Sequence, residues 1–268
     1  MVTSGGVTLS GTVTTLKSGA KLYTDESVTF TMPTRTVTVE AVYTYHTGVK
    51  VGNTTWAAYN MQDFNVGVNT AYNMFADAPY TYGSLYQFDR LWGWDPNQKA
   101  TPQNGNTSIS STAVRRWDNQ GPSFNSYDIW YAANNPCPSG WTVPNLTQYS
   151  ELLDKADYGW HARRTGEVFI VNQSSGRKLA IHFPAGYFFD MTSGNKYSDS
   201  AHMTRYITQT RGGYTNGVRN WYSFVFLRPN SPTTAWLDST VHANAPYIPS
   251  DKHTIGAGSA LRCVAGAK

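Results

Sequence analysis

The sequence has few charged residues and no long apolar run. Only 14% of its 268 residues are charged, against about a quarter in ordinary soluble domains. No run approaches the roughly 18 apolar residues that a membrane-spanning helix requires. Residues 1–6 also lack the basic and apolar regions of a signal peptide. We therefore expect no direct membrane insertion by this segment, and a leader that is absent from this chain.

A concentrated basic patch is also missing, although the net charge is +4. Two adjacent arginine pairs occur, at residues 115–116 and 163–164, and neither lies in a longer basic run. Because nucleic-acid binding needs clustered basic residues, we predict no nucleic-acid partner.

Glutamate and histidine patterns of common enzymes are absent. The four glutamates are Glu26, Glu40, Glu151 and Glu167, so a glycosidase with paired carboxylates would depend on aspartates. The six histidines show neither HxH nor HExxH spacing, which argues against a zinc site. We predict that the protein is not an enzyme and uses no cofactor or metal.

Cysteine is scarce, with Cys137 and Cys263 as the only two. Their separation matches neither a CxxC redox motif nor a zinc knuckle. Two interpretations are open, namely two buried thiols in a cytosolic protein or one disulfide, and we predict the disulfide. On the chain-entropy model a disulfide closing so long a loop stabilises the fold by about 5 kcal/mol.

Aromatic and small polar residues are what the sequence has instead. It contains 18 Tyr and 9 Trp, together with many Thr, Ser, Asn and Gly. This mixture is typical of β-rich extracellular proteins and of binding surfaces, where Tyr and Trp give contact area at low entropy cost.

The first 45 residues predict short strands, with alternation of apolar and polar residues over 37–43. The segments SGGVTLSG (4–11), VTFTMP (28–33) and VTV (37–39) resemble the second half of a divergent InlB-type B-repeat of bacterial surface proteins. The resemblance implies a partial β-repeat stalk module at 1–45, and a longer multi-module protein of which this chain is a C-terminal piece.

Residues 46–268 predict one helix among many short strands. A Gly-Asn turn at 52–53 indicates a hairpin. Asn145 is a predicted N-cap with Gln148 three residues on, and the helix is expected to end at Gly159. Later strands are predicted at 168–171, 179–183, 220–227 and 260–264. This pattern predicts an α+β fold.

A proline-rich segment, NPCPSGWTVP at residues 135–144, precedes the helix. Its three prolines exclude both a helix and a central strand. We expect a rigid corner in which Trp141 is buried and Cys137 is tied to another part of the chain.

This segment, together with YGSLYQF (82–88), FPAGY (183–187), NWYS (220–223) and LRCV (261–264), resembles the Fibrobacter succinogenes major paralogous domain over about residues 47–265. That family, found in surface proteins of Bacteroidetes-type bacteria, is similar to the C-type-lectin-like fold of diversity-generating retroelement variable proteins. The resemblance implies an α+β, C-type-lectin-like ligand-binding domain at 46–268, located outside the cell on a bacterial surface or a phage tail. One block departs from the family, which usually has Tyr-Trp-Ser-Ser where this chain has Asn-Trp-Tyr-Ser at 220–223.

The resemblance also implies where the ligand binds, since the C-terminal strands and loops carry the binding surface in lectin-like folds. The residues predicted to contact ligand are aromatic, amide and histidine residues: Tyr214, Asn216, Asn220, Trp221, Tyr222, His242, Asn244 and Tyr247. The alternative is that Trp221 and about half of the tyrosines lie in the core, because alternation along 220–227 buries one face of a strand.

Two functions follow as hypotheses. The first is a non-enzymatic adhesion or recognition domain that binds a cell-surface protein or glycan, including the case of a retroelement variable protein. The second is a structural assembly module of a surface appendage or matrix. The sequence does not indicate an oligomeric state.

Overall fold

The computed structural model describes most of the region after residue 47 and short pieces of the region before it. The described residues are 2–4, 13–16, 18–23, 38–40, 42–44, 48–64, 72–94, 130, 132–160, 166–185, 188–189, 196–197, 203–215, 218–227, 253–254 and 258–266. In this part of the chain no helix is long and apolar enough to cross a membrane.

The fold is β-rich, and the expected α+β, C-type-lectin-like class is wrong. In the described residues the strands form five sheets of two to eight strands, accompanied by one ten-residue α-helix and one 3-10 turn, η1 (Ala132–Asn134). An α+β fold needs helices that cover one face or end of a sheet. In the described residues, a single short helix covers too little of the five sheets.

The N-terminal sheet is antiparallel and has the order β2-β3-β1-β4. Its strands are β1 (Val2–Ser4), β2 (Val13–Thr15), β3 (Lys21–Tyr23) and β4 (Thr38–Glu40). The alternating run at 37–43, predicted as one strand, contributes to two sheets. β4 pairs with β1, whereas β5 (Val42–Thr44) pairs in parallel with β15 in a second sheet.

That second sheet has the order β13-β14-β15-β5. Its other strands are β13 (Asp157–Trp160), β14 (Gly166–Asn172) and β15 (Lys178–Pro184), and the last two confirm the strands predicted at 168–171 and 179–183. β14 is buried on both faces, so it reads as a continuous apolar run.

The N-terminal sheet packs on the outer face of this sheet. Leu16 and Leu22 form a buried cluster with Val168 and Ile170 of β14. The Ser18 backbone N–H and its hydroxyl both donate to the carboxylate of Asp157, the former over 2.9 Å. The division into modules at 1–45 and 46–268 stays a prediction, but the first of them is held by apolar contacts, hydrogen bonds and a shared sheet.

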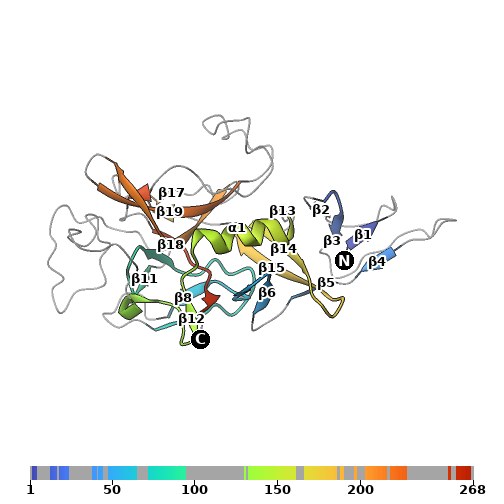
Figure 1. Cartoon of the computed structure of the whole chain (residues 1–268), viewed down its shortest axis with the longest axis horizontal. Helices are drawn as coiled ribbons and strands as arrows, with labels where there is room; N and C mark the ends of the chain where they lie inside the picture. Colours follow the sequence, from blue (N-terminus) through green and yellow to red (C-terminus); the bar gives the residue numbers. More distant parts are fainter. Residues whose placement is uncertain are drawn as a thin grey trace.

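The helix α1 (Leu146–Lys155) begins with the predicted capping box. The Asn145 side chain accepts from the Gln148 backbone N–H over 2.9 Å, and the Gln148 side chain accepts from the Asn145 N–H over 2.8 Å. The predicted end at Gly159 is wrong, because the helix stops at Lys155 and Gly159 lies in β13. Figure 1 shows α1 across the middle of the molecule, with β18 and β19 above it and β6 and β15 below.

The predicted Gly-Asn hairpin is confirmed in the third sheet, β12-β22-β7-β6. Its strands are β6 (Val49–Val51), β7 (Thr54–Trp56), β12 (Trp141–Thr142) and β22 (Val264–Ala265). Gly52 has φ +58°, and a Cβ there would collide with Glu151 of α1. Close approach is required because the Glu151 carboxylate accepts from the Asn53 N–H and the Thr54 hydroxyl, each over 2.8 Å.

The largest sheet has eight strands, with the path β11-β10-β21-β18-β19-β20 and with β16 and β17 off this path. They are β10 (Leu85–Gln87), β11 (Gly93–Trp94), β16 (Phe188–Phe189), β17 (Lys196–Tyr197), β18 (Met203–Thr215), β19 (Val218–Leu227), β20 (His253–Thr254) and β21 (Gly258–Ala260). A separate two-stranded sheet joins β8 (Met61–Asp63) to β9 (Asn73–Phe75).

Aromatic rings fill the main core between α1 and the sheets. The fully buried Trp56 ring lies 4.8 Å from Tyr149 of α1 and 5.8 Å from Phe183 of β15, centroid to centroid. Phe183 in turn meets Phe169 at 5.2 Å and Tyr206 at 4.9 Å, both edge-on. Such tilted pairs add about 0.5–1.5 kcal/mol each beyond the burial of their area, so this ring cluster binds α1 to three sheets.

Glu167 is an ionisable group in this buried region. It lies in β14 and is 3% exposed, opposite Trp160 and Phe183 in the neighbouring strands. Burial raises the pKa of Glu167 well above its usual range, because the apolar surroundings disfavour the charged carboxylate.

We expect Glu167→Gln to stabilise the protein near neutral pH. Because the pKa of Glu167 is higher in the folded than in the unfolded state, the folded state binds the proton more tightly and stability falls as pH rises between the two values. The gain should vanish below the ordinary glutamate pKa of about 4.3. Urea unfolding across pH measures this, with the exposed Asp77→Asn as matched control. An equal gain at all pH values would contradict it.

Candidate functional site

Arg262 is a fully buried polar group with several hydrogen-bond partners in the core. Its guanidinium donates to the Asn60 side-chain oxygen over 2.7 Å and to the Ala57 carbonyl over 3.0 Å. It also donates to the carbonyls of Ala58 and His182. We call Arg262 with these four acceptors the Arg262 network.

These acceptors are neutral oxygens, so the positive charge is compensated by carbonyl dipoles and by a ring face. The Arg262 carbon Cζ lies 4.6 Å from the centre of the Phe183 ring, a cation–π arrangement. Burial lowers the pKa of Arg262 to about 10. The guanidinium therefore stays charged at neutral pH.

The Arg262 network extends to Tyr206 of β18 through Asn60. The Asn60 amide donates to the Tyr206 hydroxyl over 2.9 Å, and this hydroxyl donates to the Pro184 carbonyl over 3.0 Å. Burial raises the pKa of Tyr206 to about 12, so its hydroxyl keeps its proton and remains a donor. The beginning of β18 is thus hydrogen-bonded to the centre of the molecule.

Strands β18 and β19 form an antiparallel ribbon, which we call the ribbon. Tyr206, Ile207 and Thr208 at its base are fully buried. The Gln209 N–H donates to the Pro144 carbonyl over 2.8 Å, and the Thr210 hydroxyl accepts from the first N–H of α1 over 3.0 Å. In Figure 1 the ribbon extends from this base across the upper side of the molecule.

Four of the eight predicted ligand residues have backbone positions on the ribbon. Tyr214 lies on β18 opposite Arg219, and Trp221 lies on β19 opposite Arg211. Asn220 and Trp221 also pair with β20, and Tyr222 follows them. The ladder shifts register on both sides of Arg211, as it does at a β-bulge, which increases the local twist.

The other four predicted residues, Asn216, His242, Asn244 and Tyr247, lie outside the described residues. The structure therefore brings Tyr214, Asn220, Trp221 and Tyr222 to one ribbon and does not test whether the remaining four join them.

The proline-rich segment 135–144 is fixed by the predicted disulfide. Cys137 and Cys263 are bonded, and both are buried. Their cluster includes Ile207 from the base of the ribbon. Trp141, predicted to be buried, is only half-buried, and it packs edge-on against Phe75 at 5.2 Å. It covers the disulfide cluster from outside because β12 lies at the edge of its sheet.

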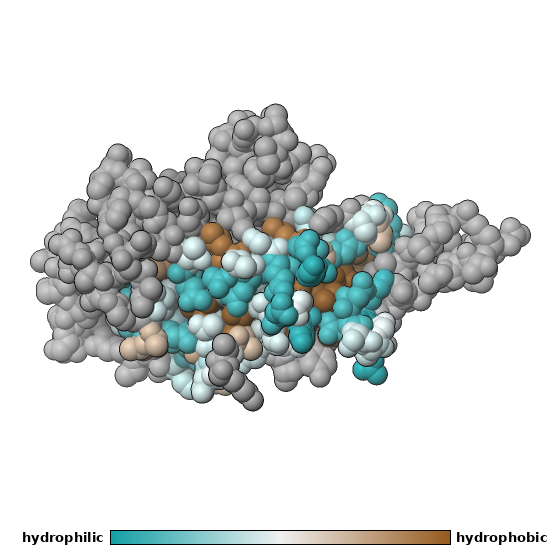
Figure 2. Space-filling view, in the orientation of Figure 1, coloured by the Kyte–Doolittle hydropathy of each residue, from teal (hydrophilic) through white to brown (hydrophobic). Residues whose placement is uncertain are grey.

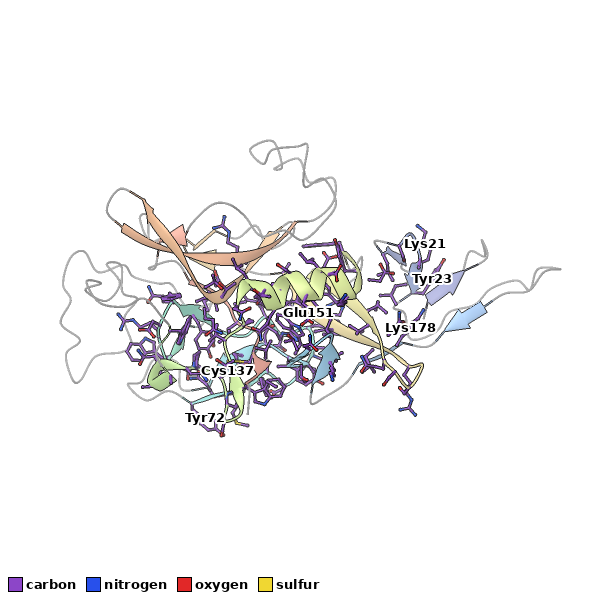
Figure 3. All side chains as sticks on the ribbon, viewed as in Figure 1. Lys21, Tyr23, Tyr72, Cys137, Glu151 and Lys178 are labelled. Carbon is purple, nitrogen blue, oxygen red and sulfur yellow. A yellow bond between two sulfur atoms is a disulfide. The ribbon has the colours of Figure 1, made fainter. Side chains whose placement is uncertain are left out.

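An exposed apolar surface was missed by the sequence reasoning. It lies on β8–β9, where alternation puts Gln62, Phe64, Tyr72 and Met74 on one side; we call this the hairpin face. Phe64, Tyr72 and Met74 are 42%, 52% and 47% exposed, and the Phe64 and Tyr72 rings lie 6.1 Å apart. Figure 3 shows Tyr72 at the lower edge of the molecule, below Cys137.

The hairpin face contrasts with the surface around α1. Figure 2 shows mostly hydrophilic residues over the middle of the molecule, where α1 lies, with hydrophobic ones only between them. The β8–β9 hairpin could have been predicted from the alternation of residues 61–64 and 72–75. Asp63 points to the inner side of this hairpin, where its carboxylate accepts from the Tyr72 and Gly93 N–H groups over 3.2 and 3.0 Å.

In the described part of the chain, no group of three or more His, Cys, Asp or Glu side chains is arranged so that it could hold a metal ion. His182 of β15 is 5% exposed and lies edge-on to Tyr80 at 4.5 Å.

Comparisons with protein-family models, with curated proteins and with solved structures found no match to this chain.

We expect Arg262→Met to lower the free energy of unfolding by roughly 3–5 kcal/mol, because it leaves four buried acceptors without their donor. Arg262→Lys should recover only part of this, since an ammonium group lacks the planar arrangement of five N–H donors. Urea unfolding measures both. The exposed Arg177→Met is the control and should change stability by no more than about 0.5 kcal/mol. Wild-type stability in Arg262→Met would refute a supporting role of the network.

Proposed function

We propose that this chain is a non-enzymatic recognition domain that binds a cell-surface protein or glycan through the ribbon. The observation that carries the proposal is the fixed base of the ribbon, which is tied to the Arg262 network through Tyr206 and to the disulfide cluster through Ile207. A surface that is already ordered loses less entropy when it binds.

Composition supports the same function. The ribbon strands carry Tyr214, Asn220, Trp221 and Tyr222, residue types that antibody-like surfaces use for adaptable contacts. The proposal needs no catalytic step and no cofactor.

We propose an extracellular location, on a bacterial surface or a phage tail, on the strength of the resemblances to the B-repeat and to the Fibrobacter succinogenes major paralogous domain. The disulfide supports it, because disulfides persist in oxidising compartments. The coding DNA tests whether the protein is a retroelement variable protein. A near-duplicate template repeat and a neighbouring reverse transcriptase gene would support this, and their absence would rule it out.

A screen against glycans and intact cells tests the recognition function. We expect the wild-type chain to bind, and a Tyr222→Ala/Tyr247→Ala double variant to lose binding at least tenfold while keeping its melting temperature. The control is Tyr80→Ala, which removes an exposed tyrosine (39%) outside both the ribbon and the hairpin face. If the double variant and the control both bind like wild type, the ribbon is not the binding surface.

A structural assembly module is the second candidate, favoured by the hairpin face. Contiguous exposed apolar side chains mark interaction surfaces, and here the partner would be another copy of the chain.

If the chain assembles, its sedimentation coefficient should rise with concentration, and Phe64→Ser/Met74→Ser should return it to a monomer. The Tyr222→Ala/Tyr247→Ala variant should still assemble. If the sedimentation coefficient stays that of a monomer at all concentrations and the chain binds a ligand, assembly is excluded and recognition remains as the function.

A further inference from the structure

The segment that contains the ribbon has arginines but no acidic residue, although these arginines are separated and form no basic run. Residues 200–237 contain four arginines, Arg205, Arg211, Arg219 and Arg228, and no Asp or Glu. Three of them lie on β18 and β19. The two ribbon strands therefore carry three positive charges and no negative one.

The strand register brings these arginines next to aromatic positions. Arg211 stands opposite Trp221, and Arg219 stands opposite Tyr214. Residues directly opposite in an antiparallel ladder have Cβ atoms about 5 Å apart. The distal half of the ribbon therefore carries two arginine–aromatic pairs, and each strand contributes one arginine and one aromatic residue.

Such a pair matches a sugar that carries a carboxylate. A guanidinium binds a carboxylate through two parallel hydrogen bonds and keeps its charge at any physiological pH. A Trp or Tyr ring offers a flat apolar surface together with a polar N–H or O–H group. We propose that the ribbon binds an acidic glycan, with Arg211 and Arg219 holding carboxylates and Trp221 and Tyr214 packing on the sugar rings; this rests on the recognition function proposed above.

A nucleic acid fits these observations less well. Its backbone requires many phosphate contacts along a basic surface, whereas the distal half of the ribbon offers two arginines. Two separated charges suit a short acidic oligosaccharide, in which carboxylates recur at intervals along the chain.

The experiment uses oligogalacturonate and its methyl ester, which has the same length and rings but no charge. We expect the full chain to bind the acid and to bind the ester at least tenfold more weakly. Binding of the acid should weaken with rising salt, because exposed charge pairs are screened.

Variants then assign the residues. Arg211→Gln and Arg219→Gln should each weaken binding of oligogalacturonate about tenfold, and Arg219→Lys should weaken it less, because it keeps the charge but loses the paired N–H donors. Arg177→Gln removes the same charge from the exposed turn between β14 and β15 and should have no effect. If a glutamine variant fails to fold, Arg211→Lys and Arg219→Lys replace it.

Three results would overturn the inference. One is equal binding of the acid and its ester. Another is an unchanged affinity in both glutamine variants, which would mean that the arginines and rings only stack on each other. The third is tighter binding of a single-stranded oligonucleotide of equal charge, which would assign the ribbon to nucleic acid.

Failure of this inference differs from failure of the recognition function. Binding of a neutral glycan or a protein, with Arg211 and Arg219 irrelevant, removes only the acidic ligand. If no glycan and no cell surface binds, the recognition function fails with it.

Discussion

The fold depends on one buried cation, Arg262, and on the neutral oxygens that surround it. Isolated charges are excluded from protein interiors unless hydrogen bonds compensate their lost hydration. Here the compensation comes from segments far apart in the sequence, residues 57–60 and His182. The guanidinium therefore links residues 57–60 to His182 and to its own segment through hydrogen bonds. These links matter because the strands nearby are short and share few backbone hydrogen bonds with each other.

The neighbouring residue adds a covalent link at the same place. Cys263 follows Arg262 and is bonded to Cys137, so the short segment between β21 and β22 carries both a polar and a covalent connection. The base of the ribbon contacts both, through Tyr206 and Ile207. These two connections, together with the pairing of β18 with β21, hold the base of the ribbon in a fixed position, and β19 also pairs with β20.

Sequence reasoning found the features that depend on local signals. The capping box at Asn145 and the turn at Gly52 are set by neighbours within a few residues. The disulfide was predictable because the chain has only two cysteines, so each has one possible partner. The helix end was wrong because pairing of β13 with β14 overrides the local preference at Gly159. The fold class was wrong because the number and size of the sheets depend on distant pairings. The Arg262 network was missed for the same reason, although an arginine inside the apolar run 260–264 was a visible signal.

The partners in the Arg262 network lie far apart in the sequence, and this separation affects when the protein can fold. Asn60 and Arg262 are 202 positions apart, and His182 and Arg262 are 80 apart. Contacts between distant residues form late, because closing long loops costs entropy before the contacts stabilise them. During synthesis, the carbonyls of residues 57–60 therefore stay hydrated until Arg262 has left the ribosome. We expect the core around Arg262 to form only after Arg262 has been synthesised, and apolar strands to be exposed to chaperones until then.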